Sequence, residues 1–383
     1  MLPALGLSVF SAWLITVTFQ LLLIDIARTF QVNVGTAGLV AAVGSISGIA
    51  AGLLMSVLCV RFNHKLFILI GLSCTCLAAV GFFLAPTFDL VLIANIGVGT
   101  GIALTSAMAY SYIGEFYPLQ KRGRAIGWIV AASTLAFVVG APVIGIIAGV
   151  GGGWRSVMIW LSLPFTLVSL IFAFFAIPNR YPESQSTQSE PFFAGYKQAF
   201  STPSAIACLI VSMLTVAESS IAFYSISFFR AQFEIGVDVG SIVVVVGSIL
   251  LAVGGITAGL FVNRMGRKPL GTLTCLMAAV LTLAFTFMPT FELSWGLNAV
   301  RFWFAGMAST ALGSLIIEQV PKFRATMTSL NTTFVNIGML LASVSAGIAL
   351  NLYNYQTMAL ILGSLGVAGT IIWVAFVKDT NKN

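Results

Sequence analysis

Charged side chains are scarce in this sequence. They make up 8% of the 383 residues, with 18 Lys and Arg against 11 Asp and Glu, whereas a soluble domain holds roughly a quarter. Hydrophobic residues make up 59% of the chain. A chain of this composition cannot cover its surface with water-facing groups, which excludes a soluble enzyme, a DNA-binding domain and a disordered protein. The composition therefore predicts a protein of the lipid bilayer.

The sequence also lacks the residue sets of metal and nucleotide sites. His64 is the single histidine, and the five cysteines lie in or beside apolar runs, so no metal site is predicted. There is no Gly-rich nucleotide-binding loop. The net charge of +7 is spread in small groups between apolar runs, which indicates membrane topology rather than nucleic-acid binding. We predict no enzyme activity, no cofactor and no nucleic-acid partner.

Apolar runs long enough to cross a bilayer fill the chain. A spanning helix needs about 20 mostly apolar residues, and the sequence predicts twelve of them in an all-α fold. The first six lie near residues 4–24, 36–60, 66–85, 90–113, 123–147 and 155–177. The second six lie near residues 204–229, 239–262, 270–288, 294–317, 326–350 and 356–377. Residues 1–178 and 204–383 thus form two predicted six-helix halves, and the polar stretch 179–203 a cytoplasmic linker.

The basic residues predict the orientation. Fourteen of the 18 fall in loops on one side of the predicted spans or in the C-terminal tail, and cytoplasmic loops carry the excess of Lys and Arg. The exceptions are Arg28, Arg155, Arg230 and Arg301. An even number of spans puts both termini on the cytoplasmic side of a multi-pass cell-membrane protein.

The two predicted halves repeat each other at an offset of 203 residues. Pro86-Thr87-Phe88-Asp89 becomes Pro289-Thr290-Phe291-Glu292. The same offset takes Arg61 to Arg264, Lys65 to Lys268, Gly52 to Gly255, Asn95 to Asn298, Glu115 to Glu318 and Pro118 to Pro321. Six spans in each half keep both copies the same way up, which is a parallel repeat. Such a repeat around a midplane cavity favours a solute carrier that rocks one half against the other.

The loop after the eighth span carries a recognisable motif. It reads Gly259-Leu-Phe-Val-Asn263-Arg264-Met-Gly266-Arg267-Lys268, which resembles the G-x-L-A-D-R-x-G-R-R/K signature of the major facilitator superfamily. A degraded copy holds Arg61 and Lys65 in the first half. The signature's Asp is Asn263 in one copy and Val60 in the other. The resemblance implies the major facilitator fold, a monomer, and a cavity lined by the first, fourth, seventh and tenth spans.

Two further patterns fit this resemblance. Glu115 and Glu318 end spans four and ten, where each could pair with Arg61 or Arg264 and latch the cytoplasmic side; the alternative is topological charge with loose pairs. We group these with Lys65, Arg267 and Lys268 as gating candidates.

Pro142 and Gly145 in span five match the antiporter signature of the family's drug-efflux branches; the alternative is an ordinary transmembrane kink. Those drug-efflux branches carry an arginine in span four, and this chain has Asn95 at that position.

Ionisable residues within spans mark candidate functional sites, because they are costly in a bilayer. Glu218 lies near the middle of span seven, on a polar stripe with Ser212, Thr215 and Ser219. We interpret it as the proton-coupling residue, with a structural hydrogen-bonded carboxyl as the alternative. Asp25, near the outer end of span one, is a second candidate, or a helix-end charge beside Arg28.

Arg301, seven residues into span ten, lies roughly 10 Å below the outer boundary, and Glu218 roughly 16 Å below it. Arg301 therefore either pairs with Glu218, binds an anionic substrate group, or snorkels outward. Further candidates for the cavity wall are Trp13, Gln20, Asn95, Tyr110, Phe223, Tyr224, Asn298 and Trp303.

These features predict a secondary active transporter for a small organic compound, driven by the proton gradient, with export by antiport favoured. The alternatives are proton-coupled uptake of a small organic anion, and a membrane receptor or scaffold that transports nothing.

Overall fold

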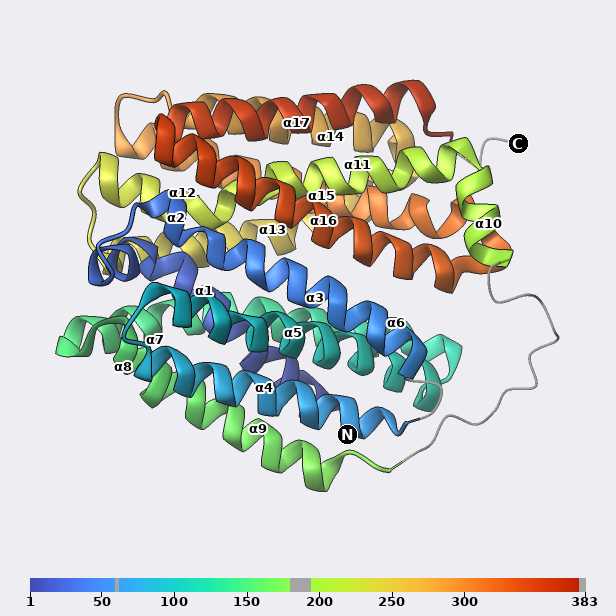
Figure 1. Cartoon of the computed structure of the whole chain (residues 1–383). Helices are drawn as coiled ribbons and strands as arrows, with labels where there is room; N and C mark the ends of the chain where they lie inside the picture. The colour runs from blue at the N-terminus through green and yellow to red at the C-terminus, as the bar shows by residue number, and fades with distance from the viewer. Residues whose placement is uncertain (59–61, 180–193, 379–383) are drawn as a thin grey trace. The chain divides into compact units, whose positions relative to one another are not determined.

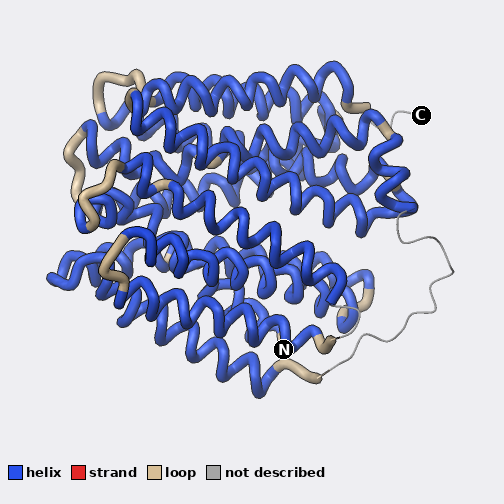
Figure 2. Tube along the Cα trace, in the orientation of Figure 1, coloured by secondary structure: helices blue, strands red, loops and turns tan. Residues whose placement is uncertain are grey.

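The computed structural model describes residues 1–58, 62–179 and 194–378, and all regular structure in these ranges is helical (Figures 1 and 2). The all-α prediction is confirmed. The first helices are α1 (Leu2–Thr29), α2 (Val34–Ala37), α3 (Leu39–Leu58), α4 (His64–Leu84), α5 (Phe88–Phe116), α6 (Leu119–Val138), α7 (Gly140–Ile147), α8 (Gly153–Val157) and α9 (Leu163–Ala176). The later ones are α10 (Ala194–Ser201), α11 (Pro203–Ser219), α12 (Ile221–Gln232), α13 (Val237–Met265), α14 (Arg267–Phe285), α15 (Phe291–Gln319), α16 (Arg324–Leu352) and α17 (Tyr355–Phe376).

The number of membrane crossings depends on one irregular segment. Eleven helical runs of the described residues are long and apolar enough to span a membrane, and one of them, Arg124–Ala176, contains 53 residues. At about 1.5 Å per residue this run is nearly 80 Å long, more than twice the thickness of a bilayer core. Gly151, inside the short π-helical segment Ala148–Gly152, and Gly153, directly after it, have φ of 113° and 60° and interrupt the run before a second π-helical segment, Met158–Ser162. These glycines mark the turn between the predicted fifth and sixth spans, which gives twelve crossings.

The chain forms two compact units. Unit 1 contains residues 1–185 and 235–245, and unit 2 contains residues 186–234 and 246–383. The first turns of α13 therefore group with unit 1. The predicted linker lies mostly in residues 180–193, outside the described residues, and its cytoplasmic location stays a prediction.

Backbone details repeat at the offset found in the sequence. Helices α5 and α15 each contain 29 residues and begin after an extended threonine, Thr87 and Thr290. Gln31 and Glu234, also 203 apart, are non-glycine residues with nearly equal positive φ, 55° and 53°. Matching strain at matching positions shows that the repeat is structural.

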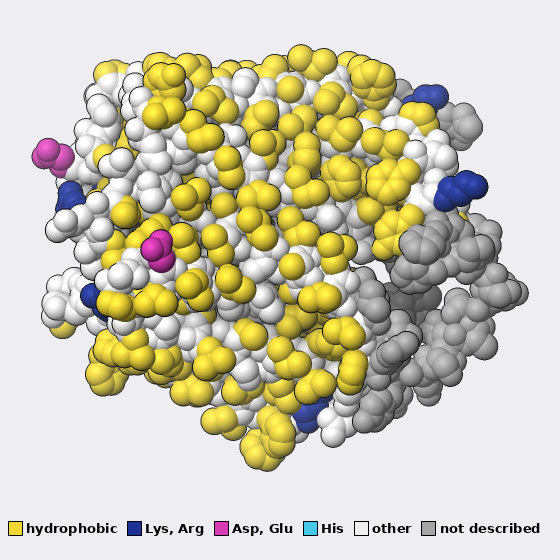
Figure 3. Space-filling view, viewed as in Figure 1, with side chains coloured by type: hydrophobic (Ala, Val, Ile, Leu, Met, Phe, Trp, Pro, Cys, Tyr) yellow, Lys and Arg dark blue, Asp and Glu magenta, His cyan; other side chains and the backbone are white. Residues whose placement is uncertain are grey.

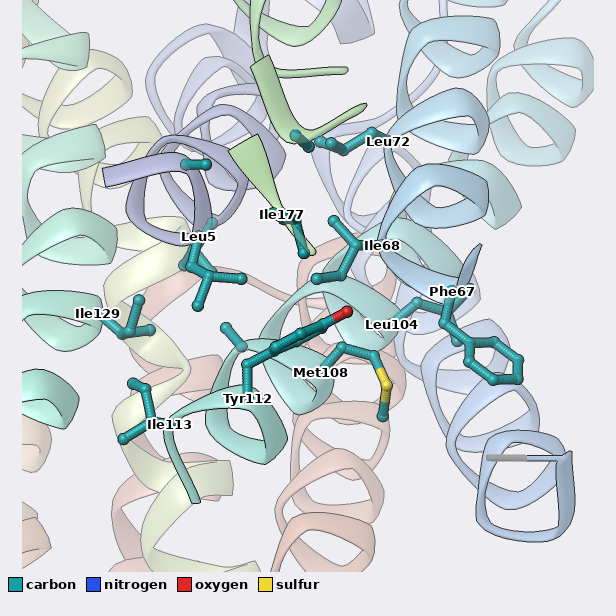
Figure 4. Packing of buried hydrophobic residues seen from close by; sticks show 14 of the residues in the cluster. Leu5, Phe67, Ile68, Leu72, Leu104, Met108, Tyr112, Ile113, Ile129 and Ile177 are labelled. Carbon is teal, nitrogen blue, oxygen red and sulfur yellow. The ribbon is translucent and has the colours of Figure 1, made fainter. Parts of the chain in front are cut away.

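Each unit packs its own apolar core, and its flanks are apolar as well. In unit 1, α1, α4, α5 and α6 bring side chains such as Leu5, Ile68, Met108 and Ile129 together (Figure 4). Hydrophobic side chains also cover much of the viewed surface, where few charged ones appear (Figure 3). Leu77, for example, is 72% exposed. A surface of this kind fits lipid rather than water.

Candidate functional site

The interior of unit 2 holds a buried charge pair. Glu218 comes from α11 and Arg301 from α15, and the two residues are 1% and 0% exposed. Arg301 Nη1 lies 3.7 Å from Glu218 Oε1, which is an ion pair but too long for a hydrogen bond. The sequence left open whether Arg301 pairs with Glu218, meets substrate or snorkels, and the structure pairs it with Glu218. Their roles in transport stay a prediction.

Two hydroxyl groups hold the Glu218 carboxylate. Thr282 of α14 donates a hydrogen bond to Oε1, and Ser219 donates one to Oε2 at 3.0 Å. Gly366 of α17 packs against the stem of the side chain, since a Cβ there would lie 2.8 Å from Glu218 Cγ. Glu218 is therefore enclosed by α14 and α17 within the unit.

The Arg301 guanidinium is only partly satisfied. Its Nε donates to Asn298 Oδ1 at 3.0 Å, and its Cζ lies 4.4 Å from the centre of the Phe302 ring. Nη1 and Nη2 are buried and form no hydrogen bond with the residues that the structure describes. A buried cation with spare donors is costly, so the nearby carboxylate is its main source of stabilisation.

Helix geometry places opposing influences on the carboxylate. Glu218 lies in the last turn of α11, which ends at Ser219, and α12 restarts at Ile221. The partial negative charge of a helix C-terminus disfavours a carboxylate there, whereas Arg301 and Thr282 favour it. No group of three potential metal ligands occurs among the described residues.

Most of the predicted cavity residues already have protein partners. In unit 1, Asn95 Nδ2 donates to the Val40 carbonyl of α3 at 2.6 Å, and Trp13 packs against Phe137. In unit 2, Trp303 Nε1 donates to Thr257 Oγ1 at 3.1 Å.

Burial separates the remaining candidates. Gln20 and Tyr224 are buried, and the Phe223 ring packs against that of Tyr224, while Tyr110 is 44% exposed. Of all these candidates, Tyr110 therefore offers the most accessible surface.

The outer part of α1 is irregular beside its acidic residue. Leu22 has non-helical angles, φ −112° and ψ 21°, between Gln20 and Asp25. Asp25 is partly buried, and its backbone carbonyl accepts a hydrogen bond from Thr29 Oγ1 at 2.7 Å. Helix α7 likewise starts at Gly140, just before Pro142 and Gly145, where Val139 separates it from α6.

The gating candidates of unit 2 form a link between neighbouring helices. Glu318 of α15 pairs with Arg267 of α14, and both side chains are about a quarter exposed, at 28% and 24%. The predicted partner, Arg264, is exposed. Lys268 Nζ donates to the Val374 carbonyl at 2.9 Å. In unit 1, Arg61 and the side chain of Glu115 lie outside the described residues, so the corresponding pair stays a prediction.

Thr282 and Gly366 are the site residues that the sequence did not reveal. Thr282 lies about 23 Å along α14 from its first residue, Arg267, and Glu218 lies about 23 Å along α11 from its first residue, Pro203. A comparison of depths could therefore have found Thr282. Nothing in the sequence distinguishes Gly366 from the other 36 glycines.

Known proteins resemble this chain over most of its length. Multidrug resistance protein 2 of Bacillus subtilis (strain 168) is 22% identical over 322 residues, which are 82% of this chain and 80% of that protein. The lincomycin resistance protein LmrB of Listeria monocytogenes is 32% identical over 90 residues, 23% of this chain and 18% of that protein.

Solved transporters share the fold. A D-xylose-proton symporter superposes with a TM-score of 0.80 at 16% identity, covering 100% of this chain and 98% of that one. The nucleoside transporter NupG gives a TM-score of 0.81 at 17% identity, with coverages of 98% and 99%. The family model described as Major Facilitator Superfamily matches residues 3–306. The chain therefore belongs to the Major Facilitator Superfamily of membrane transporters.

Proposed function

We propose that this transporter exports a small organic compound across the cell membrane in exchange for protons, by alternating access with both termini in the cytoplasm. The observation that carries the proposal is the Glu218–Arg301 pair, a carboxyl buried at mid-span against a single counter-charge. Pro142 and Gly145 in α7 and relatives named multidrug resistance proteins support export.

The pair can couple a proton to a change in packing. With Glu218 ionised, the two charges neutralise each other inside unit 2. Once Glu218 takes a proton, Arg301 loses its counter-charge while its two terminal nitrogens already lack hydrogen bonds. A buried unpaired charge is strongly unfavourable, so protonation favours a different arrangement of α11 and α15. Substrate that binds the arrangement in which Glu218 is ionised would favour release of the proton. Substrate and proton would then occupy the carrier in turn, which is exchange.

One observation favours a second function, proton-coupled uptake of a small organic anion. The spare Nη1 and Nη2 donors of Arg301 match the acceptor pattern of a carboxylate or phosphate. Protonation of Glu218 would free this positive charge for an anion. Proton and anion would then bind together, which is symport.

The test begins with ligands that raise the melting temperature of the purified protein, since a ligand that binds the folded state stabilises it. Flux of such a ligand is then measured in proteoliposomes under a pH gradient. Antiport predicts movement against the direction of proton flow and loss of the coupled movement in Glu218→Gln. The control is Glu292→Gln, which removes an exposed carboxylate from the first turn of α15. Gradient-driven flux that is unchanged in Glu218→Gln would contradict the proposal, and movement with the protons would support the second function.

A further inference from the structure

A groove runs between α4 and α9 on an open flank of unit 1. Its volume is about 330 Å³, and it is lined by Leu69, Ser73, Leu170, Ile171, Phe174 and Phe175. Ile171 and Phe175 are 58% and 79% exposed. Apart from Ser73 the lining is apolar, so the groove suits a hydrocarbon chain rather than a polar solute.

A lysine lies at one end of this groove. Lys65, Leu69 and Ser73 follow at intervals of four residues, which places them on one face of α4. Lys65 is 9% exposed, and its Nζ lies 5.0 Å from the centre of the Phe174 ring, which also lines the groove. Within the ranges that the structure describes, the ammonium has no hydrogen bond and no anionic partner.

Lys65 lies in the first turn of α4, where a cation is unfavourable. The side chain of Asn63 accepts a hydrogen bond from Lys65 N and caps the start of α4. The N-terminus of a helix carries partial positive charge, which disfavours a cation and favours an anion. The helix start and the Lys65 ammonium would both be stabilised by one bound anionic group.

In the second copy of the repeat, the corresponding lysine has a hydrogen-bond partner within the protein. Lys268, at the position of Lys65 plus 203, donates its Nζ to the Val374 carbonyl of α17 at 2.9 Å. The protein itself therefore satisfies Lys268. Among the described residues, Lys65 has only the face of an aromatic ring.

We propose that this groove binds a phospholipid with an anionic headgroup, whose phosphate contacts Lys65 and one of whose acyl chains fills the groove. From Lys65 to Ser73 the helix rises about 12 Å, which fits within one leaflet of a hydrocarbon core of about 30 Å. Lys65 lies at the cation-rich end of the spans, predicted to be cytoplasmic, and the cytoplasmic leaflet of cell membranes carries anionic lipids.

The test is native mass spectrometry of the purified full chain titrated with phosphatidylglycerol or with phosphatidylcholine of the same acyl chains. The wild type should bind one phosphatidylglycerol more tightly than phosphatidylcholine. Lys65→Gln should weaken phosphatidylglycerol about fivefold, the share of one lysine near an anionic surface, and leave phosphatidylcholine unchanged. The matched control, Lys268→Gln, should bind both lipids as the wild type does.

A second variant addresses the groove and keeps the charge. Ser73→Trp fills the groove and should weaken both lipids while Lys65 is intact, so the test survives if Lys65→Gln fails to fold. Equal affinity of the wild type for the two lipids, or unchanged phosphatidylglycerol binding in both variants, would overturn the proposal. Displacement of the lipid by glycerol phosphate at equal concentration would also overturn it, because it would show a headgroup site without a chain in the groove.

Discussion

The two units repeat their backbone but differ in what they bury. Shifting by 203 residues takes Arg301 to Val98, Thr282 to Ala79 and Glu218 to Ile15. These three residues of unit 1 are apolar and at most 3% exposed, at 3%, 0% and 0%. Where unit 2 holds a charge pair and its hydroxyl partner, unit 1 holds ordinary apolar packing.

The asparagines that both units keep show the same divergence. Asn95 joins α5 to α3 through the Val40 carbonyl, whereas Asn298 accepts the hydrogen bond of Arg301 Nε. The same residue at the same repeat position therefore packs helices in one unit and orients a charge in the other. Unit 1 is apolar at these positions, and unit 2 holds the buried Glu218–Arg301 pair to which we assign the proton in our proposal.

The largest difference is expected when one residue is truncated at the same repeat position in each unit. Arg301→Ala leaves the Glu218 carboxylate buried without its counter-charge and should cost about 3–5 kcal/mol of unfolding free energy. Val98→Ala should cost about 1–2 kcal/mol, the loss of buried methyl groups. Thermal melting in detergent measures both.

Acidic buffer should recover part of the stability that Arg301→Ala loses, because a protonated Glu218 needs no counter-charge. It should recover none of the stability that Val98→Ala loses. The double variant Arg301→Ala with Glu218→Gln should melt above Arg301→Ala alone. Equal losses at the two positions, with no effect of pH, would show that the pair is no more than packing.

Truncation of the two asparagines should give a smaller difference in unfolding free energy than truncation of Arg301 and Val98. Asn298→Ala removes a hydrogen bond to a charged group, worth about 1.5–3 kcal/mol, and Asn95→Ala removes a neutral one, worth about 0.5–1.5 kcal/mol. Only Asn298→Ala should also move the pH midpoint of transport, since Asn298 contacts Arg301. A shifted midpoint in Asn95→Ala would contradict the division of roles between the units.

The smallest effect is expected at the end of α15. Because Glu318 and Arg267 are about a quarter exposed, at 28% and 24%, Glu318→Gln should cost no more than about 1 kcal/mol. Arg267→Gln should cost as much, and Arg264→Gln less, in the same melting assay. A loss of stability in Arg264→Gln equal to that in Arg267→Gln would instead support the Glu318–Arg264 pair that the sequence suggested.

Depth along the helices could be predicted from the sequence, but rotation about their axes could not. Counting residues from the span ends placed Arg301 within reach of Glu218, and the structure pairs them. The same counting did not predict which neighbouring helix the Asn95 side chain contacts. In the structure it donates a hydrogen bond to the Val40 carbonyl of α3. In spans that are apolar on every side, the pattern of residues does not mark which face packs inward.

Partners at helix ends and turns were likewise beyond the sequence. Arg264 lies in the last turn of α13 and Arg267 begins α14, with the turn at Gly266, whose φ is 82°, between them, and it is Arg267 that pairs with Glu318. The span boundaries around Gly151 were closer to prediction, because glycine tolerates the positive φ that such a turn requires.

The most direct test of the account measures protons exchanged when substrate binds to the purified protein. Calorimetry in two buffers of different ionisation enthalpy gives this number for the wild type, Glu218→Gln and the control Glu292→Gln. The account predicts that substrate binding releases protons from the wild type and the control, and that Glu218→Gln binds substrate without releasing any. Proton release by Glu218→Gln equal to that of the wild type would contradict the central claim that the Glu218–Arg301 pair is the proton site.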